Sequence, residues 1–279
     1  MKPEVVAPMN LAEYVTEFNL PSLRANVALA GKHEPLAKAF DVNVMMWKHQ
    51  VPEEMTMLKT LADKVRPEHC AVLLVDVQND FCADGGAMQR EGRDLTLVQA
   101  MIPRLERFLG AARVAGVKCV WIRNVYNTGP NWYLSEVWLE QARRRRKGAY
   151  VQYSVCEPGE WNGDFFQIRP RADEAVVTKH RYGAFESTDL DLVLRSQGIR
   201  TVIMTGIATN VCVETTARQA FLRDYYVVFT SDCTSTFTQA EHAATLNNID
   251  QFFGQVATAE EVMACWPAEA AAPRVRAAS

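Results

Sequence analysis

Short apolar runs alternate with longer amphipathic runs along most of this chain, and this alternation restricts the possible folds more than any other feature. Residues 71–75, Ala-Val-Leu-Leu-Val, are apolar throughout, as expected of a strand covered on both faces. Residues 95–115 predict a helix, because apolar side chains recur there at helical spacing. These side chains are Leu97, Met101, Leu105 and Leu109.

The same two kinds of run continue toward the C-terminus. Further strands are expected at residues 117–122, 174–178, 201–205, 225–230 and 254–257. Further helices are expected at residues 189–196, 211–222 and 239–251. Strands that alternate with helices predict a parallel sheet covered on both faces. We therefore expect an α/β fold over residues 67–267, a three-layer αβα domain built on a doubly wound, mostly parallel six-stranded sheet.

Three segments lie outside this alternation. Residues 1–66 predict a helical N-terminal extension that packs on the core or on a neighbouring subunit, and a homo-oligomer is expected. Residues 268–279 are expected to form a frayed tail. Residues 131–166 contain a predicted helix, 133–146, that ends in the basic run 143–147. Such a run is typical of a solvated helix end, and a role toward an anionic substrate or an interface remains the alternative.

Composition excludes several classes of protein. The formal net charge of −3 gives no electrostatic reason to bind nucleic acid or an anionic membrane. No apolar run approaches the roughly 18 residues of a membrane span, and no hydrophobic signal region follows Met1, so a cytoplasmic location is expected. The 7 cysteines are odd in number and lack Cys-x-x-Cys spacing, which favours neither disulfides nor a zinc site.

Cys212 lies where the expected strand 201–205 leads into the expected helix 211–222. A thiol at a helix N-terminus lies in the positive end of the helix dipole, close to unpaired backbone N–H groups. We therefore expect the thiolate form of Cys212 to be favoured, as a nucleophile requires. A small buried hydrophobe is the ordinary alternative for any cysteine.

Two charged residues end other strands at the same edge of the predicted sheet. Asp76 follows the first strand and Lys179 follows the third. An acid can accept the thiol proton of Cys212, while a cation keeps that acid ionised. Asp80 is a rival acid, and we expect it to cap a loop instead.

These residues lie in three segments that resemble the signatures of the isochorismatase-like cysteine hydrolases. The segments are 76–81 (Asp-Val-Gln-Asn-Asp-Phe), Lys179, and 206–213 (Gly-Ile-Ala-Thr-Asn-Val-Cys-Val). The likeness extends over residues 70–266 in the order typical of the family, and the three segments together are highly specific. Within the family, residues 179–185 and 196–214 are most similar to the ureidoacrylate amidohydrolases of pyrimidine catabolism, whereas residues 1–66 have no counterpart that we recognise.

The resemblance implies a role for each residue. Cys212 is then the nucleophile, Asp76 the general base and later acid, and Lys179 the charge that tunes both. It also implies a cis peptide between Ile207 and Ala208, and an oxyanion hole formed by the N–H groups of Ala208 and Cys212.

The resemblance also bears on metals. The nicotinamidase branch of the family holds a metal with an aspartate and histidines after the second strand, but residues 122–129 contain no histidine here. The five histidines of the chain show no ligand spacing. We therefore expect no metal and no cofactor, which disfavours nicotinamide as a substrate.

The expected activity is hydrolysis of a small amide or ureido C–N bond through a thioester, on a ureidoacrylate-like substrate. Biuret-, N-carbamoyl- or maleamate-type substrates are the first alternative. An isochorismatase, which uses no cysteine nucleophile, and a non-catalytic binding module are weaker ones. Four residues are candidates for holding the small-molecule substrate. They are Asn124, Tyr126, Tyr182 and Gln251.

Overall fold

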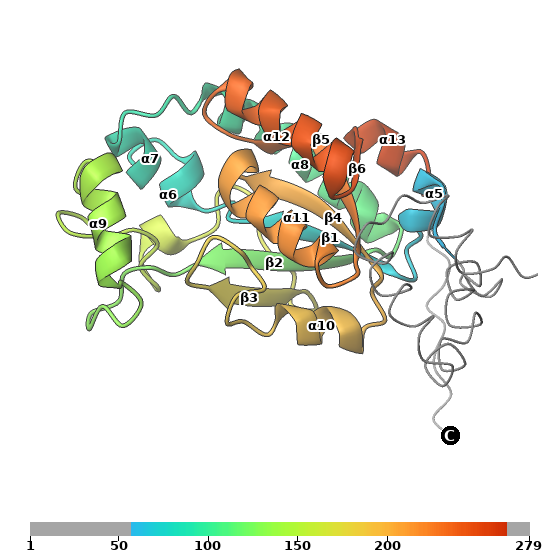
Figure 1. Ribbon diagram of the computed structural model, residues 1–279, viewed down its shortest axis with the longest axis horizontal. Helices are drawn as coiled ribbons and strands as arrows, with labels where there is room; N and C mark the ends of the chain where they lie inside the picture. Colours follow the sequence, from blue (N-terminus) through green and yellow to red (C-terminus); the bar gives the residue numbers. More distant parts are fainter. Residues whose placement is uncertain (1–56, 267–279) are drawn as a thin grey trace, which may run out of the picture. The chain divides into compact units, whose positions relative to one another are not determined.

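The computed structural model describes residues 57–266 and contains the expected sheet of 6 parallel strands (Figure 1). The strand order is β3-β2-β1-β4-β5-β6, so the chain winds from β1 first to one side and then to the other. The three-layer αβα prediction is confirmed. The strands are β1 Cys70–Val75, β2 Lys118–Asn124, β3 Ala175–Lys179, β4 Thr201–Ile207, β5 Tyr226–Ser235 and β6 Gln255–Ala257.

Helices cover both faces of the sheet, because alternate residues of each strand point to opposite sides. On one face, Val72 and Leu74 of β1 pack in a cluster with α8 and α13. On the other, Ala71 and Leu73 pack with α10, α11 and α12. These helices are α8 Thr96–Val114, α10 Leu190–Ser196, α11 Glu214–Phe221, α12 Gln239–Phe252 and α13 Ala259–Met263.

Some expectations were wrong in detail. Leu97 does not belong to the buried face of α8 and is 39% exposed, whereas Val98 is buried, because the apolar stripe continues through neighbouring positions. Strand β5 runs five residues beyond the expected residue 230, to Ser235. Three short helices were not expected, namely α6 Asn79–Cys82, α7 Ala87–Arg90 and η2 Trp161–Gly163. Helix α5 Leu61–Lys64 lies in the segment expected to be helical, and α9 Glu136–Arg145 is shorter than the predicted 133–146.

Residues 58–66 pack against the sheet domain. Val65 is fully buried, its carbonyl accepts a hydrogen bond from Nε1 of Trp266, and the Leu58 amide donates to the Tyr226 hydroxyl. The rest of the expected extension, residues 1–56, and the expected tail from 267 onward lie outside the described residues. Between residues 57 and 266, no helix has the length and apolar character that crossing a bilayer demands.

Strand β4 comes very close to the end of β1 at Gly206, which pairs with Val75. A Cβ at this position would lie 2.1 Å from the Val75 carbonyl oxygen, and the φ of +101° is one that side chains rarely permit. Only glycine therefore lets β4 run this close to the end of β1. The close approach brings the turn after β4 beside the residue that follows β1.

Candidate active site

The carboxyl ends of four adjacent strands supply the polar groups at this edge of the sheet. Asp76 follows β1, Asn124 ends β2, and Lys179 ends β3, where it pairs in register with Asn124. Cys212 lies in the turn after β4. Because β3, β2, β1 and β4 are neighbours in the sheet, the topology alone brings these residues together.

Asp76 lies at the centre of this group. Its Oδ2 is 2.8 Å from Nζ of Lys179 and accepts a hydrogen bond of 2.8 Å from Nδ2 of Asn124. The same Nδ2 lies 4.0 Å from Sγ of Cys212. Oδ1 of Asp76 is buried and has no hydrogen-bond partner among the described residues. Asp76 therefore has one oxygen fixed by a lysine ammonium group and an asparagine amide, and the other free to take a proton.

The backbone fixes the direction of the Asp76 side chain. Asp76 has a φ of +54°, and its amide donates to the Ile122 carbonyl at 2.9 Å. Gln78 anchors the neighbouring strand end, because its side-chain oxygen accepts from the Asn124 amide and its Nε2 donates to the Asn124 carbonyl. Hydrogen bonds to their backbones thus hold both Asp76 and Asn124 in place for the contact between their side chains.

Burial dominates the electrostatics. It raises the pKa of the Cys212 thiol to about 12, and the Asp76 carboxylate adds to this effect while Lys179 opposes it. Burial also raises the pKa of Asp76 above its usual range, although Lys179 and Cys212 oppose the shift. For Lys179, burial alone would lower the pKa, but Asp76 and Cys212 outweigh it and raise the pKa. The expectation of a favoured Cys212 thiolate is therefore wrong for the resting site, because the side chain is withdrawn from water beside a carboxylate.

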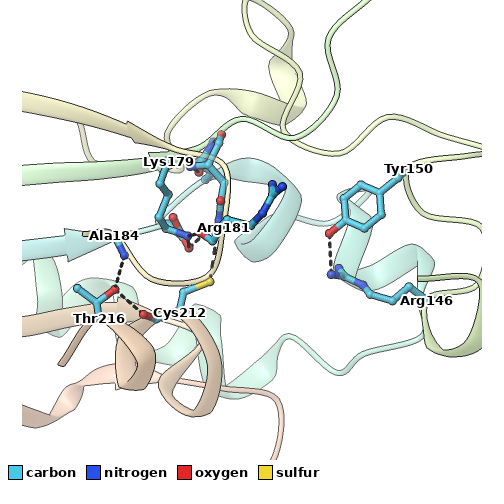
Figure 2. A network of polar contacts seen from close by, with 10 residues as sticks. Arg146, Tyr150, Lys179, Arg181, Ala184, Cys212 and Thr216 are labelled. Atoms are coloured by element: carbon cyan, nitrogen blue, oxygen red, sulfur yellow. Dashed lines mark hydrogen bonds and ion pairs between the residues drawn. The ribbon is translucent and has the colours of Figure 1, made fainter. Parts of the chain in front are cut away.

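The turn that carries Cys212 begins at a cis peptide between Ile207 and Ala208 and continues as one π-helical turn, Thr209–Val213. α11 follows directly, so the thiol lies one turn before the α-helix proper. The Cys212 carbonyl accepts from the Thr216 hydroxyl at 2.7 Å, and that hydroxyl accepts from the Ala184 amide at 3.1 Å (Figure 2). The loop after β3 therefore holds the helix that carries Cys212.

A second contact fixes the start of this turn. The Thr209 hydroxyl lies 2.9 Å from Nδ1 of His242, whose Nε2 lies 2.9 Å from the Ser231 carbonyl. Burial lowers the pKa of His242, so the neutral ring donates from Nε2 to the carbonyl and accepts from Thr209 at Nδ1. We find no hydrogen bond from the Ala208 amide to another described residue, so this N–H is available to a ligand.

A cavity of about 180 Å³ opens onto this group. Asp76, Ala208 and Cys212 line it at the sheet edge, and Tyr126 and Tyr182 line it from the loops after β2 and β3. Tyr126 is almost fully buried, and its hydroxyl makes no hydrogen bond to another described residue. The volume accommodates a small molecule of the size expected from the sequence.

Two of the four expected substrate-binding residues do not line the cavity. Gln251 is exposed on α12, where its Nε2 donates to Asn247 one turn earlier, so this prediction was wrong. It points away because the buried face of α12 is formed by other positions, among them Ile249. Asn124 is fully buried behind Asp76 and contacts the carboxylate instead of the cavity.

The C-terminal end of α9 supplies cavity residues that were not among the site residues expected from the sequence. Arg145 and Arg146 line the cavity, facing Glu91 and Arg93 from the segment after α7. The basic run 143–147 was the available signal, but a solvated helix end was the simpler interpretation. Arg145 and Arg146 reach the cavity because α9 packs over this edge of the sheet, and a local sequence pattern cannot reveal such tertiary packing.

Asp80, the rival acid, does not reach the cavity. Its Oδ1 accepts from the Ala87 amide at 2.9 Å and its Oδ2 accepts from the Cys156 amide at 2.6 Å. It therefore joins α7 to the loop before η2, which agrees with the expected capping role. In the described part of the chain, no three His, Cys, Asp or Glu side chains are grouped in a way that could hold a metal ion.

Comparison with known proteins gives consistent matches. The sequence model of the isochorismatase domain matches residues 70–261. Ureidoacrylate amidohydrolase RutB of Serratia proteamaculans is 34% identical over 201 residues, which cover 68% of this chain and 79% of that protein. A cysteine hydrolase from Pseudomonas syringae pv. phaseolicola superposes with a TM-score of 0.62 and 25% identity, covering 76% of this chain and 97% of the other.

One match reaches the N-terminal segment. Ureidoacrylate amidohydrolase RutB of Stutzerimonas stutzeri is 29% identical over 282 residues, which cover 97% of this chain and 100% of that protein. An alignment of this extent necessarily includes most of residues 1–66. Residues 1–66, for which the sequence alone suggested no recognisable counterpart, therefore do align with a segment of this relative.

Proposed function

The chain belongs to the isochorismatase family of hydrolases, and on that basis we propose that it is a metal-independent cysteine amidohydrolase. The bond cleaved is a small amide or ureido C–N bond, and the substrate is ureidoacrylate-like. The observation that carries the proposal is the buried contact of Asp76 with Lys179, beside Cys212 and open to a small cavity. Relatives named as ureidoacrylate amidohydrolases support the substrate class.

The first half of the reaction transfers an acyl group to sulfur. Oδ1 of Asp76 takes the Cys212 proton as the thiolate attacks the carbonyl carbon. The developing oxyanion accepts hydrogen bonds from the N–H groups of Ala208 and Cys212, each typically worth about 3 kcal/mol of barrier. Protonated Asp76 then gives its proton to the departing amine, and the C–N bond breaks to leave a thioester.

The second half returns the enzyme to its starting state. Asp76, ionised again, removes a proton from water, and the hydroxide attacks the thioester. The C–S bond breaks, and the proton on Asp76 returns to sulfur. With a ureido substrate the acyl group is carbamoyl, so hydrolysis gives carbamic acid, which decomposes to carbon dioxide and ammonia. Lys179 keeps its charge throughout and stabilises the Asp76 carboxylate at both steps in which Asp76 is ionised.

A substrate panel tests this proposal. Ureidoacrylate, biuret, an N-carbamoyl amino acid, maleamate and nicotinamide are incubated with the protein, and ammonia release is measured. We expect ureidoacrylate to give the largest kcat/KM and nicotinamide none. Ammonia from maleamate or biuret in preference to ureidoacrylate would move the chain to the alternative amidase group. Absence of turnover on every compound would contradict the proposal.

Metal removal is expected to leave the activity unchanged. The groups around Asp76 in the described structure are an amide, an ammonium group and a thiol. A catalytic zinc is usually held by histidines and carboxylates, so these groups do not fit it. Activity is measured before and after dialysis against a strong chelator, with zinc and manganese added back. Loss of ammonia release that either metal restores would contradict the metal-independent mechanism.

A further inference from the structure

We propose that the C-terminal end of α9 binds a carboxylate of the substrate, with Arg146, the residue after the helix, supplying directed N–H donors and Arg145 supplying positive charge. This inference rests on the proposed function, since it concerns the same cavity, and it assigns a role to residues that the reaction steps do not use. The substrate class that follows is a short ureido or amide acid whose carboxylate lies on the departing amine.

The charges that line the cavity are unevenly compensated. Asp76 is neutralised by Lys179, and Glu91 is paired with Arg146 at 2.8 Å. Arg93, Arg145 and Glu241 also line the cavity. Two cations therefore face one additional anion, and the wall opposite the sheet edge carries a net positive charge. An uncharged substrate would gain nothing from this arrangement.

Arg146 is held in a fixed orientation. Its Nε donates to Glu91 at 2.8 Å, one terminal nitrogen donates to the Tyr150 hydroxyl at 2.8 Å, and the other lies 3.9 Å from Sδ of Met88. A guanidinium has five N–H donors, so Glu91, Tyr150 and Met88 leave two of them over, and these point to the side of the cavity where Tyr182 and a ligand can accept them. Figure 2 shows the guanidinium end of Arg146 directed toward Cys212. The group is thus preorganised for a carboxylate at the far side of the cavity.

Arg145 differs from its neighbours in the same run. Its side chain lines the cavity, although it is also partly open to solvent, and makes no hydrogen bond or ion pair within residues 57–266. Arg144 pairs instead with Glu140 along the exposed surface of α9, and Arg143, which is exposed like Arg145, does not line the cavity. The free charge at the cavity is therefore a property of Arg145, and Arg143 provides a matched control on the same helix.

The groups between the two ends fit a short substrate. Tyr126 and Tyr182 line the cavity together with the apolar side chains of Phe81, Ile207 and Phe237. Cys212 and the C-terminal end of α9 line the same small cavity, so one short molecule can reach both. These walls favour an unbranched, apolar or planar linker between the two polar ends of the substrate.

The test compares two probes on three proteins. The probes are 3-ureidoacrylate and its uncharged N,N-dimethylamide, and the proteins are the parent, Arg145→Gln and Arg143→Gln. For the acid, Arg145→Gln is expected to raise KM about two- to fivefold, with the effect on KM and not on kcat, as for one partly exposed ion pair. KM for the dimethylamide, and both constants of Arg143→Gln, are expected to stay at the parent values. A further variant, Arg146→Lys, keeps the charge beside Glu91 but loses the planar fork, and should also weaken the acid selectively.

Binding separates this inference from the proposed function. Calorimetry with Cys212→Ser protein gives Kd for both probes without turnover, alone and combined with Arg145→Gln. Tighter binding of the acid than of the dimethylamide, lost in the Arg145→Gln background, supports the carboxylate site even if no ammonia is released from either probe. Equal Kd and KM values for the two probes, or equal effects of Arg145→Gln and Arg143→Gln, would overturn it even if both probes are hydrolysed.

Discussion

Cys212→Ser is expected to lower kcat about ten-thousandfold, the largest loss that any single substitution in the chain should cause. A serine hydroxyl is a far weaker acid than a thiol, and Asp76 is too weak a base to remove its proton at a useful rate. The loss corresponds to about 5 kcal/mol of transition-state stabilisation. The side chains are nearly equal in size, so the cavity and the fold should be retained.

Ammonia release measures this effect, and mass spectrometry of the quenched reaction should reveal an acyl group on the parent protein. Cys265→Ser is the matched control, because Cys265 is the most exposed cysteine of the described residues and lies outside the cavity. It should retain the parent activity. Turnover by Cys212→Ser close to that of the parent would show that another group is the nucleophile.

The raised pKa of Cys212 adds a chemical expectation to this variant. Because burial raises the thiol pKa to about 12, free alkylating reagents should modify Cys212 slowly at neutral pH. In the proposed mechanism Asp76 takes the proton as the sulfur attacks a bound substrate, so we expect the reactivity of the buried Cys212 thiol to depend on occupation of the cavity.

The fold could be predicted from the sequence because its signals are local. The apolar run of β1 and the helical spacing of α8 each contain their own periodicity, and their alternation determines the parallel sheet. The short helices α6 and α7 could not be predicted, since four residues show no period and depend on tertiary contacts such as those of Asp80. The extra length of β5 likewise depends on pairing with the end of β4 after a register shift.

For the candidate site, the sequence could likewise indicate which strand ends meet, but not how the side chains around them pack. Asp76, Lys179 and Cys212 could be expected together because strand ends in a parallel sheet share one edge. The thiol pKa was misjudged because a helix terminus can be recognised in sequence, whereas full burial beside a carboxylate cannot. Gln251 and Arg146 were misjudged for a similar reason. The packing of α12 and α9 determines which of their residues line the cavity, and this packing cannot be read from the sequence.

Asp76→Asn is expected to lower kcat/KM about a thousandfold, because the amide cannot accept the thiol proton. The pH profile gives a sharper readout than the rate. Burial raises the pKa of Asp76, so in the parent kcat/KM should rise with pH as this carboxyl loses its proton, and the acid limb should lie above the usual carboxyl range. In Asp76→Asn the residual activity should lack that limb, since no proton remains to be lost there.

Asp80→Asn provides the control, because it makes the same chemical change in a buried carboxylate of the neighbouring helix α6. An amide can accept only one of the two backbone hydrogen bonds from Ala87 and Cys156, so the variant should lose about 1–3 kcal/mol of unfolding free energy. Its kcat per folded molecule and its acid limb should stay close to those of the parent, and urea unfolding with activity assays separates the two effects. A larger loss of kcat in Asp80→Asn than in Asp76→Asn, or an acid limb that persists in Asp76→Asn, would assign the base to another residue. Another residue, which has no role in the proposed mechanism, would then accept the proton from Cys212.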